Sequence, residues 1–272
     1  MTIKLVTNEK IAETSSKGNQ EKWYDKETDM WYKLDQFGYE ALTETFISTM
    51  LEKSNIELDT PFTFLRYAME KLSVRGLERT GCVSHNFLQP SQSLITINRL
   101  LTHHLGFPLR QKLMKLSSDK KRIAYLADAT ADYTGLVDFP RYLTLLFEID
   151  SLFCNDDRHL NNIAVIEQAG KYSYCPIFDN AAGLLSNTQL SRMDIEPKAL
   201  ISALQARPLN TTFNRQMKTA QNLYTRQLVL PAINLALIQE TLQPLLKYYA
   251  QRDRGLISDR VIKCISLRFK LI

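Results

Sequence analysis

Asn-Asp-Asp-Arg-His-Leu-Asn-Asn at residues 155–162, together with Phe-Asp-Asn at residues 178–180, decides how this chain is interpreted. An Asp, an Asn five positions later and then a second Asp are typical of a loop that transfers phosphoryl groups. Magnesium prefers the hard oxygen ligands that carboxylates and amides supply. The spacing makes Asp157 the candidate base, and Asn162 and Asp179 the candidate metal ligands. The alternative is that these residues only cap a helix and form a turn.

The residues around this motif predict a helix, a loop and a hairpin. Residues 141–153 are rich in Leu and Phe at helical spacing, which predicts a buried helix. Residues 163–167 and 172–178 predict two short strands joined by a turn that contains a glycine. That hairpin would carry Asp179 back toward Asp157. Because helix, loop and hairpin agree, a functional loop is favoured over a simple cap.

A second candidate segment, Ser-Ser-Lys-Gly-Asn-Gln-Glu-Lys, occupies residues 15–22. It has a single glycine, so it is not a Walker A loop, which needs G-x-x-x-x-G-K-[ST]. It leads into a predicted hairpin formed by residues 21–24 and 30–34. Backbone N–H groups of such a polar turn can form a concave anion site. Alone, the segment fits an ordinary surface loop, whereas the downstream Asp motif favours a phosphate loop.

Lys33 lies in the second strand of that hairpin. If its two strand neighbours face a core, Lys33 faces the opposite side, where a cleft would use its ammonium against phosphates. Residues 39–51 predict a helix on which Glu40 and Glu44 lie one turn apart and share a face. A Lys on a strand followed by a helical Glu is the arrangement that positions this Lys in phosphoryl-transfer enzymes. The alternative for all three side chains is a solvated surface position.

The D-x-H-x-x-N pattern of Asp157, His159 and Asn162, with the later Asp179, resembles that of HipA-like kinases. That family shares a distant fold with phosphatidylinositol kinases. The G-x-Q-x-K pattern of residues 18–22 is similar to the phosphate loop of the same family. The resemblance covers roughly residues 1–45 and 141–185. It implies ATP and magnesium as cofactors, and Ser or Thr of a protein as the acceptor.

The resemblance also implies roles for individual residues. Asp157 would deprotonate the acceptor hydroxyl, and His159 would support the loop or the transferring phosphate. Asn162 and Asp179 would hold magnesium. The residues expected to contact the nucleotide are Ser16, Lys17, Gly18, Asn19, Gln20, Lys33, Glu40, Phe87 and Leu88. The choice between Glu40 and Glu44 as the partner of Lys33 stays open, with Glu40 slightly favoured.

Two departures from the family bear on partners. Gly18 lies near the start of the chain, which matches compact, CtkA-like members and puts an antitoxin partnership in doubt. Arg158 stands where the HipA toxin has a small residue, so the acceptor preference is expected to differ. The family often phosphorylates itself in the phosphate loop, which makes Ser15 or Ser16 the expected site.

The predicted fold class is α+β, a two-lobed protein-kinase-like fold. Residues 1–88 would form a small lobe with an antiparallel sheet, which residues 62–71 and 81–88 complete. Residues 89–95, rich in Pro, Ser and Gln, would form a hinge. Residues 96–272 would form a larger helical lobe, with helical character from Leu94 onward apart from the hairpin. Adenine would lie near the hinge.

Composition narrows the class of protein. The chain has 272 residues and a net charge of +5, which permits phosphate ligands but does not favour nucleic acid as a partner. Four cysteines without paired spacing indicate reduced thiols and a cytoplasmic protein, although secretion as an effector stays open. No stretch predicts a membrane span. The alternatives are a lipid or small-molecule kinase, and a nucleotide-binding pseudokinase or interaction module.

Overall fold

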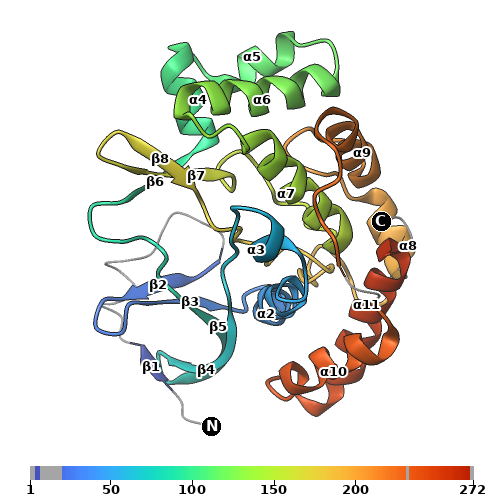
Figure 1. Ribbon diagram of the computed structural model, residues 1–272. Helices are drawn as coiled ribbons and strands as arrows, with labels where there is room; N and C mark the ends of the chain where they lie inside the picture. The colour runs from blue at the N-terminus through green and yellow to red at the C-terminus, as the bar shows by residue number, and fades with distance from the viewer. Residues whose placement is uncertain (1–3, 7–19, 231–232, 270–272) are drawn as a thin grey trace.

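A five-stranded sheet and a body of helices form the two lobes of this molecule, seen in a computed structural model (Figure 1). The structure describes residues 4–6, 20–230 and 233–269. The predicted α+β class, with small sheets and many helices, is confirmed. Among the described residues, no helix is long and apolar enough to cross a membrane.

The strands of the first sheet lie in the order β1-β4-β5-β3-β2. The predicted antiparallel pairing is confirmed for four strands, and β1 adds a parallel edge beside β4. Arg75 and Gly76, between β4 and β5, have φ values of 53° and 77°, as a two-residue hairpin turn of type I′ requires. The strands are β1 (Lys4–Val6), β2 (Lys22–Asp25), β3 (Met30–Leu34), β4 (Ala68–Val74) and β5 (Leu77–His85).

The two faces of this sheet have different neighbours. Tyr32 and Leu34 of β3 pack with Trp23 in a small apolar core on one face. Lys33 points to the other face, toward helix α2 (Glu40–Leu51), as the strand alternation predicts. The short helix α3 (Ile56–Asp59) follows α2.

The second sheet has the order β6-β7-β8 and belongs to the helical lobe. The predicted hairpin is present as β7 (Ala164–Gln168) and β8 (Lys171–Tyr174), but its second strand ends at Tyr174 and not at Phe178. The predicted helical character from Leu94 onward is wrong at its start, because Ser93–Thr96 forms β6 and pairs with β7. This partner lies about seventy residues further along the chain, beyond the reach of local pattern analysis. The strand predicted over residues 62–71 likewise begins only at Ala68.

Helix α7 (Phe139–Phe153) is the buried centre of the larger lobe. It packs against α6, α9 and α11. Cys154 ends the helix in the left-handed conformation, at φ 56°, and so turns the chain into the segment 155–162. The other helices of this lobe are α4 (Ile97–Leu105), α5 (Leu109–Lys115), α6 (Asp119–Thr134), α8 (Pro197–Ala203), α9 (Phe213–Tyr224), α10 (Leu235–Leu246) and α11 (Gln251–Phe269).

The C-terminal helices return to the first lobe. Helix α10 packs against α2 on the side away from the sheet (Figure 1). In the turn before α11, the Tyr249 hydroxyl donates to the Asp35 carboxylate at 2.7 Å. The Thr80 hydroxyl of β5 donates to the Tyr248 carbonyl at 2.9 Å. The C-terminal helices and the turn between them are therefore attached to the first lobe.

Candidate active site

The loop after α7 is held by hydrogen bonds between its own residues. The Asn155 side chain accepts from the Asp157 amide at 3.2 Å, and the Asp157 carbonyl accepts from the His159 amide at 2.8 Å. The Asn162 side-chain amide donates to the same carbonyl at 2.9 Å. These contacts use the backbone of Asp157 and leave its carboxylate 58% exposed. A carboxylate held in this way can meet an acceptor hydroxyl.

Arg158 fastens this loop to the chain on either side of it. Its guanidinium is fully buried and pairs with Asp150 of α7 at 3.0 Å. It also donates to the Phe178 carbonyl at 2.6 Å, the Asn180 side chain at 2.6 Å and the Asn162 carbonyl at 3.3 Å. Arg158 thus bonds both the loop that ends at Asn162 and the segment that carries Asp179. It therefore holds these two segments next to each other.

The Asp179 segment is fixed a second time from the small lobe. The Leu65 amide donates to the Ile177 carbonyl at 2.8 Å, and the Ile177 amide donates to the Thr63 carbonyl at 2.8 Å. Asp179 itself has φ 61°, an uncommon value for a residue other than glycine. Strained backbone of this kind persists where surrounding contacts determine it, often at functional sites.

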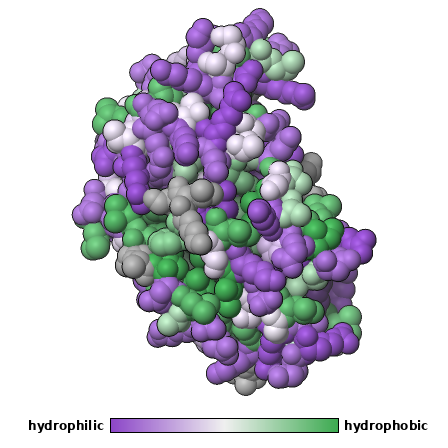
Figure 2. All heavy atoms as spheres, turned by 90° about the vertical axis from the view of Figure 1, so that its right-hand side faces the viewer, coloured by the Kyte–Doolittle hydropathy of each residue, from purple (hydrophilic) through white to green (hydrophobic). Residues whose placement is uncertain are grey.

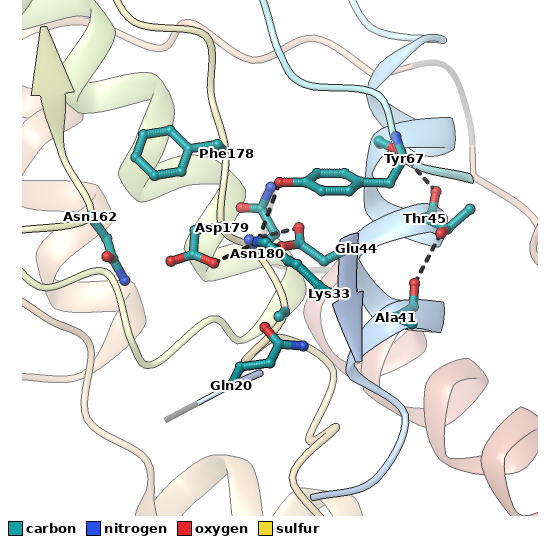
Figure 3. A network of polar contacts seen from close by, with 12 residues as sticks. Gln20, Lys33, Ala41, Glu44, Thr45, Tyr67, Asn162, Phe178, Asp179 and Asn180 are labelled. Carbon is teal, nitrogen blue, oxygen red and sulfur yellow. Dashed lines mark hydrogen bonds and ion pairs between the residues drawn. The ribbon is translucent and has the colours of Figure 1, made fainter. Parts of the chain in front are cut away.

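Lys33 lies at the centre of an ion-pair cluster that joins three elements (Figure 3). Its ammonium contacts Glu44 of α2 at 2.5 Å and Asp179 at 2.8 Å. It also lies 3.4 Å from the Tyr67 hydroxyl and over that ring. The second oxygen of Glu44 accepts from the Asn180 amide at 2.9 Å. The cluster therefore ties β3 and α2 to the segment beside the catalytic loop.

The preference for Glu40 as the partner of Lys33 is wrong. The Glu40 carboxylate accepts from the amides of Phe37 at 2.7 Å and Gly38 at 3.0 Å. It therefore caps the turn that leads into α2, a typical role for an acidic residue at a helix N-terminus. Glu44, one turn later, points at the cleft instead.

Charges in the cluster set the ionisation of its carboxylates. Burial alone would raise the pKa of Asp179, but the ammonium groups of Lys33 and Lys22 outweigh it and hold that pKa below its ordinary value. Burial raises the pKa of Asp157, opposed by His159 and assisted by Asp179. Burial and the neighbouring Asp157 raise the pKa of Asp156 to about 6. Asp179 thus stays ionised as a metal ligand must, while Asp157 becomes a better proton acceptor.

The candidate phosphate loop lies only partly within the residues that the structure describes. Ser15, Ser16, Lys17, Gly18 and Asn19 lie outside the described residues. Gln20 donates through its side-chain amide to the Leu34 carbonyl at 2.8 Å, which fixes the end of the segment beside β3.

Lys22 follows this segment on β2, directly opposite Lys33 in the sheet register. Burial lowers the pKa of Lys22, and the charge of Asp179 opposes that shift. Paired strand residues present their side chains on one face, so two ammonium groups face the cleft.

Phe87 and Leu88, the residues expected near adenine, lie next to apolar side chains of the second sheet. Both are half-buried and pack on the cluster of Ala164, Ile166 and Cys175. The Phe87 ring lies 5.9 Å from the ring of Phe178, the residue before Asp179. This arrangement gives the cleft an apolar wall beside the charged cluster, which suits a planar base.

His159 lies beside Asp157, the candidate base, without bonding to it. Its Nε2 is 4.0 Å from the Asp157 carboxylate. Its Nδ1 is buried, and no hydrogen-bond partner for it lies within the described residues. Buried polar atoms are almost always satisfied, so this nitrogen is a candidate contact for a ligand.

Sequence analysis missed several residues that shape the site. It assigned no role to Asp150, Asn155 or Tyr67, and it placed Arg158 without its partners. The one available signal was Asp150 itself, an acid within the apolar run of α7, since a buried charge requires a partner.

The described residues fit a magnesium site of the kind that substrate phosphates complete. Asn162 and Asp179 supply two oxygen-bearing side chains on adjacent segments, which Arg158 holds together. No group of three His, Cys, Asp or Glu side chains suited to a metal occurs in the described part of the chain. Magnesium is commonly bound through one or two carboxylates, water and substrate phosphate rather than by a full protein cage.

Comparison with known proteins agrees with this geometry at the level of the fold. No protein-family model and no curated protein sequence matches the chain. The solved structure of the Helicobacter pylori proinflammatory kinase CtkA is similar, with a TM-score of 0.61 and 13% identity over 94% of this chain and 90% of that one. The HipA chain from a Shewanella oneidensis toxin–antitoxin complex with HipB and operator DNA gives a TM-score of 0.45 and 11% identity. This chain spans 64% of that HipA chain. The similarity to CtkA confirms, at the level of the fold, the predicted resemblance to HipA-like kinases.

Proposed function

We propose that this protein is an ATP- and magnesium-dependent kinase that phosphorylates Ser or Thr of a protein. The observation that carries the proposal is the cluster of Lys33, Glu44 and Asp179. A Lys on a strand, its helical Glu and a metal-binding Asp are the parts that a kinase must align. Here they meet beside a loop that exposes Asp157.

In this proposal, the chain's own residues position the reactants. Asp157 would accept the proton of the acceptor hydroxyl, and its raised pKa makes it a stronger base than an ordinary Asp. Lys33 would leave Asp179 for the nucleotide phosphates, while Glu44 keeps its ammonium in place. Asn162 and Asp179 would hold magnesium, which when bound neutralises charge on the transferring phosphoryl group.

Ser15 and Ser16 extend the proposal to self-regulation. They precede Gly18 in the segment that resembles a phosphate loop, and they lie outside the described residues. A phosphate on either adds roughly −1.5 to −2 charges at neutral pH, which would repel the nucleotide phosphates. Peptide mass spectrometry after incubation with ATP and magnesium tests this, because an active preparation without phosphate at either Ser contradicts it.

Transfer from labelled ATP to the chain itself and to a mixture of proteins tests the main proposal. Asp157→Ala should lower transfer by about 10² to 10⁴-fold, the usual contribution of a positioned base. Its affinity for ATP, measured by thermal shift with magnesium, should stay within a few-fold. Asp132→Ala, at an exposed position on α6, is the matched control. Magnesium-independent binding, or full activity of Asp157→Ala, would remove the proposal.

A further inference from the structure

A groove of about 580 Å³ opens beside the catalytic loop. Residues of α4, α5, α6, the catalytic loop and the α8–α9 connection line it. Its volume lies in the range of about 300–1,000 Å³ that is typical of ligand sites. His159 and Asn161 contribute from the loop itself, so one end of the groove lies two residues from Asp157. A chain segment in the groove could therefore bring a hydroxyl to that carboxylate.

The charge of this groove is one-sided. Arg110, Arg122 and Arg207 line it, and none of the described lining residues is acidic. Figure 2 shows that hydrophilic side chains dominate the top of the molecule, the level at which α4, α5 and α6 lie in Figure 1. A cleft lined by charge of one sign concentrates ligands of the opposite sign.

Two of these arginines are available to a ligand. Arg122 is already engaged, by Asp119 at 2.9 Å and the Leu113 carbonyl at 3.1 Å. Arg110 and Arg207 are exposed, and neither forms an ion pair with a carboxylate in the part of the chain that the structure describes. Burial raises the pKa of Asp157, and Arg207 is among the cations that oppose this rise, so its charge acts at the catalytic Asp.

The loop that carries Arg207 is held before any ligand arrives. The Ala206 amide donates to the Thr211 carbonyl at 2.7 Å and closes the base of the loop. The Gln216 side chain of α9 donates to the Arg207 carbonyl at 2.7 Å. A cation on a fixed loop loses less conformational entropy on binding than one on a free loop.

Part of the remaining lining is apolar. Leu113 and Met114 of α5 face the groove, together with Leu160 and Leu209. Met114 is 70% exposed and adds apolar surface to this wall. An inositol phosphate headgroup would satisfy the arginines and leave these walls uncovered. An extended peptide uses both, because its acidic side chains reach the cations and its backbone and methylenes cover the apolar residues.

We propose, on the premise of the proposed kinase function, that this groove binds the acceptor protein. Arg110 and Arg207 select an extended segment that carries Asp or Glu beside the Ser or Thr to be phosphorylated. The specificity of the enzyme is then for acidic sequences. It arises outside the catalytic loop, from α5 and the α8–α9 connection, which the phosphoryl-transfer chemistry does not require.

Binding of labelled peptides tests the groove without catalysis. One peptide carries Glu on both sides of an Ala in place of the acceptor Ser, and its counterpart carries Gln. Arg110→Ala and Arg207→Ala should each weaken binding of the Glu peptide by about fivefold, the upper range for an exposed charge pair, and their combination by about 25-fold. Arg207→Lys should retain most of the affinity. Arg99→Ala, at an exposed position of α4 outside the groove, is the control that should change nothing.

The proposal is overturned if both peptides bind equally well, or if the arginine variants bind the Glu peptide as the unaltered protein does. Arginine-dependent binding to phosphoinositide vesicles in preference to the Glu peptide also overturns it, in favour of a lipid acceptor. Phosphorylation of the corresponding Ser peptides then tests the acidic specificity separately from the kinase function. Equal rates on Glu and Gln peptides contradict acidic specificity alone. A protein that binds the Glu peptide but transfers phosphate to no acceptor contradicts the kinase assignment itself.

Discussion

Lys33 and Arg158 are both buried cations paired with carboxylates, yet their surroundings differ in kind. Arg158 is 0% exposed and has Asp150, two backbone carbonyls and the Asn180 side chain around its planar fork. Lys33 bridges Glu44 and Asp179, and the Asp179 side chain is 23% exposed. The fully buried contacts of Arg158, here called the closed network, fix the geometry of the loop. The Lys33 cluster includes Asp179, a partly exposed carboxylate that can exchange partners. Arginine suits the first task and lysine the second, because only the lysine ammonium can be redirected without breaking a fork of bonds.

The largest effect on phosphoryl transfer is expected from removing Asp179 from the Lys33 cluster. Asp179→Ala should lower phosphoryl transfer by at least about 10³-fold, because the metal contributes several kcal/mol of transition-state stabilisation. Magnesium-dependent binding of ATP, followed by thermal shift, should be lost as well. The fold should persist, since Lys33 keeps Glu44. An active Asp179→Ala protein would contradict the proposed metal site.

Breaking the closed network should act on stability instead. Arg158→Met leaves Asp150 buried and unpaired, which should cost about 3–5 kcal/mol of unfolding free energy. Urea denaturation measures this loss. Arg192→Met, in the exposed pair with Asp194, is the matched control and should change stability by less than about 1 kcal/mol. If both variants unfold alike, Arg158 does not act as a scaffold.

The two glutamates of α2 sharpen the comparison further. Glu44→Gln removes the charge that holds Lys33, and the loss of such a bond is worth about 1.5–3 kcal/mol, or roughly tenfold to hundredfold in kcat/KM. Glu40→Gln keeps an acceptor for the turn before the helix and should lower kcat/KM only slightly. Steady-state kinetics on the two variants decide the assignment, and the reverse order would restore Glu40 as the partner.

Asp35, a half-buried carboxylate, shows how the pKa responds when no cation bonds to the carboxylate oxygens. Burial raises the pKa of Asp35 to about 8, opposed by hydrogen bonds from the Ala41 amide and the Tyr249 hydroxyl. Because the folded-state pKa is raised, its contribution to stability is full below the ordinary value of 3.8 and is lost as pH rises through about 8. Asp35→Asn should therefore be less sensitive to pH between 5 and 8.5.

Urea unfolding of Asp35→Asn and the unaltered protein at the two pH values gives the difference directly. The exposed Asp132→Asn serves as the control, because it removes a carboxylate without changing a buried site. A stability gap that does not widen in favour of Asp35→Asn at the higher pH would show that this carboxyl titrates normally.

Elements formed by residues that are close in sequence could be predicted from the local sequence pattern. The β2–β3 and β7–β8 hairpins have short turns and alternating strands, and α7 has an unmistakable apolar period, so all three were predictable. β6 was not, because its partner is remote in sequence. The choice between Glu40 and Glu44 depends on which way each side chain points, and residues one turn apart share a face in any pattern. The partners of Arg158 span three segments, which no local signal joins.

The contacts of Tyr248 and Tyr249 with the first lobe have a consequence for biosynthesis. Translation produces the sheet and α2 early, long before α10 and the turn that follows it leave the ribosome. Until then α2 lacks the helix that covers its outer side, so Glu44 is on an element without its full packing. The packing of the helix that carries Glu44 is therefore complete only after α10 and the turn that follows it have been made.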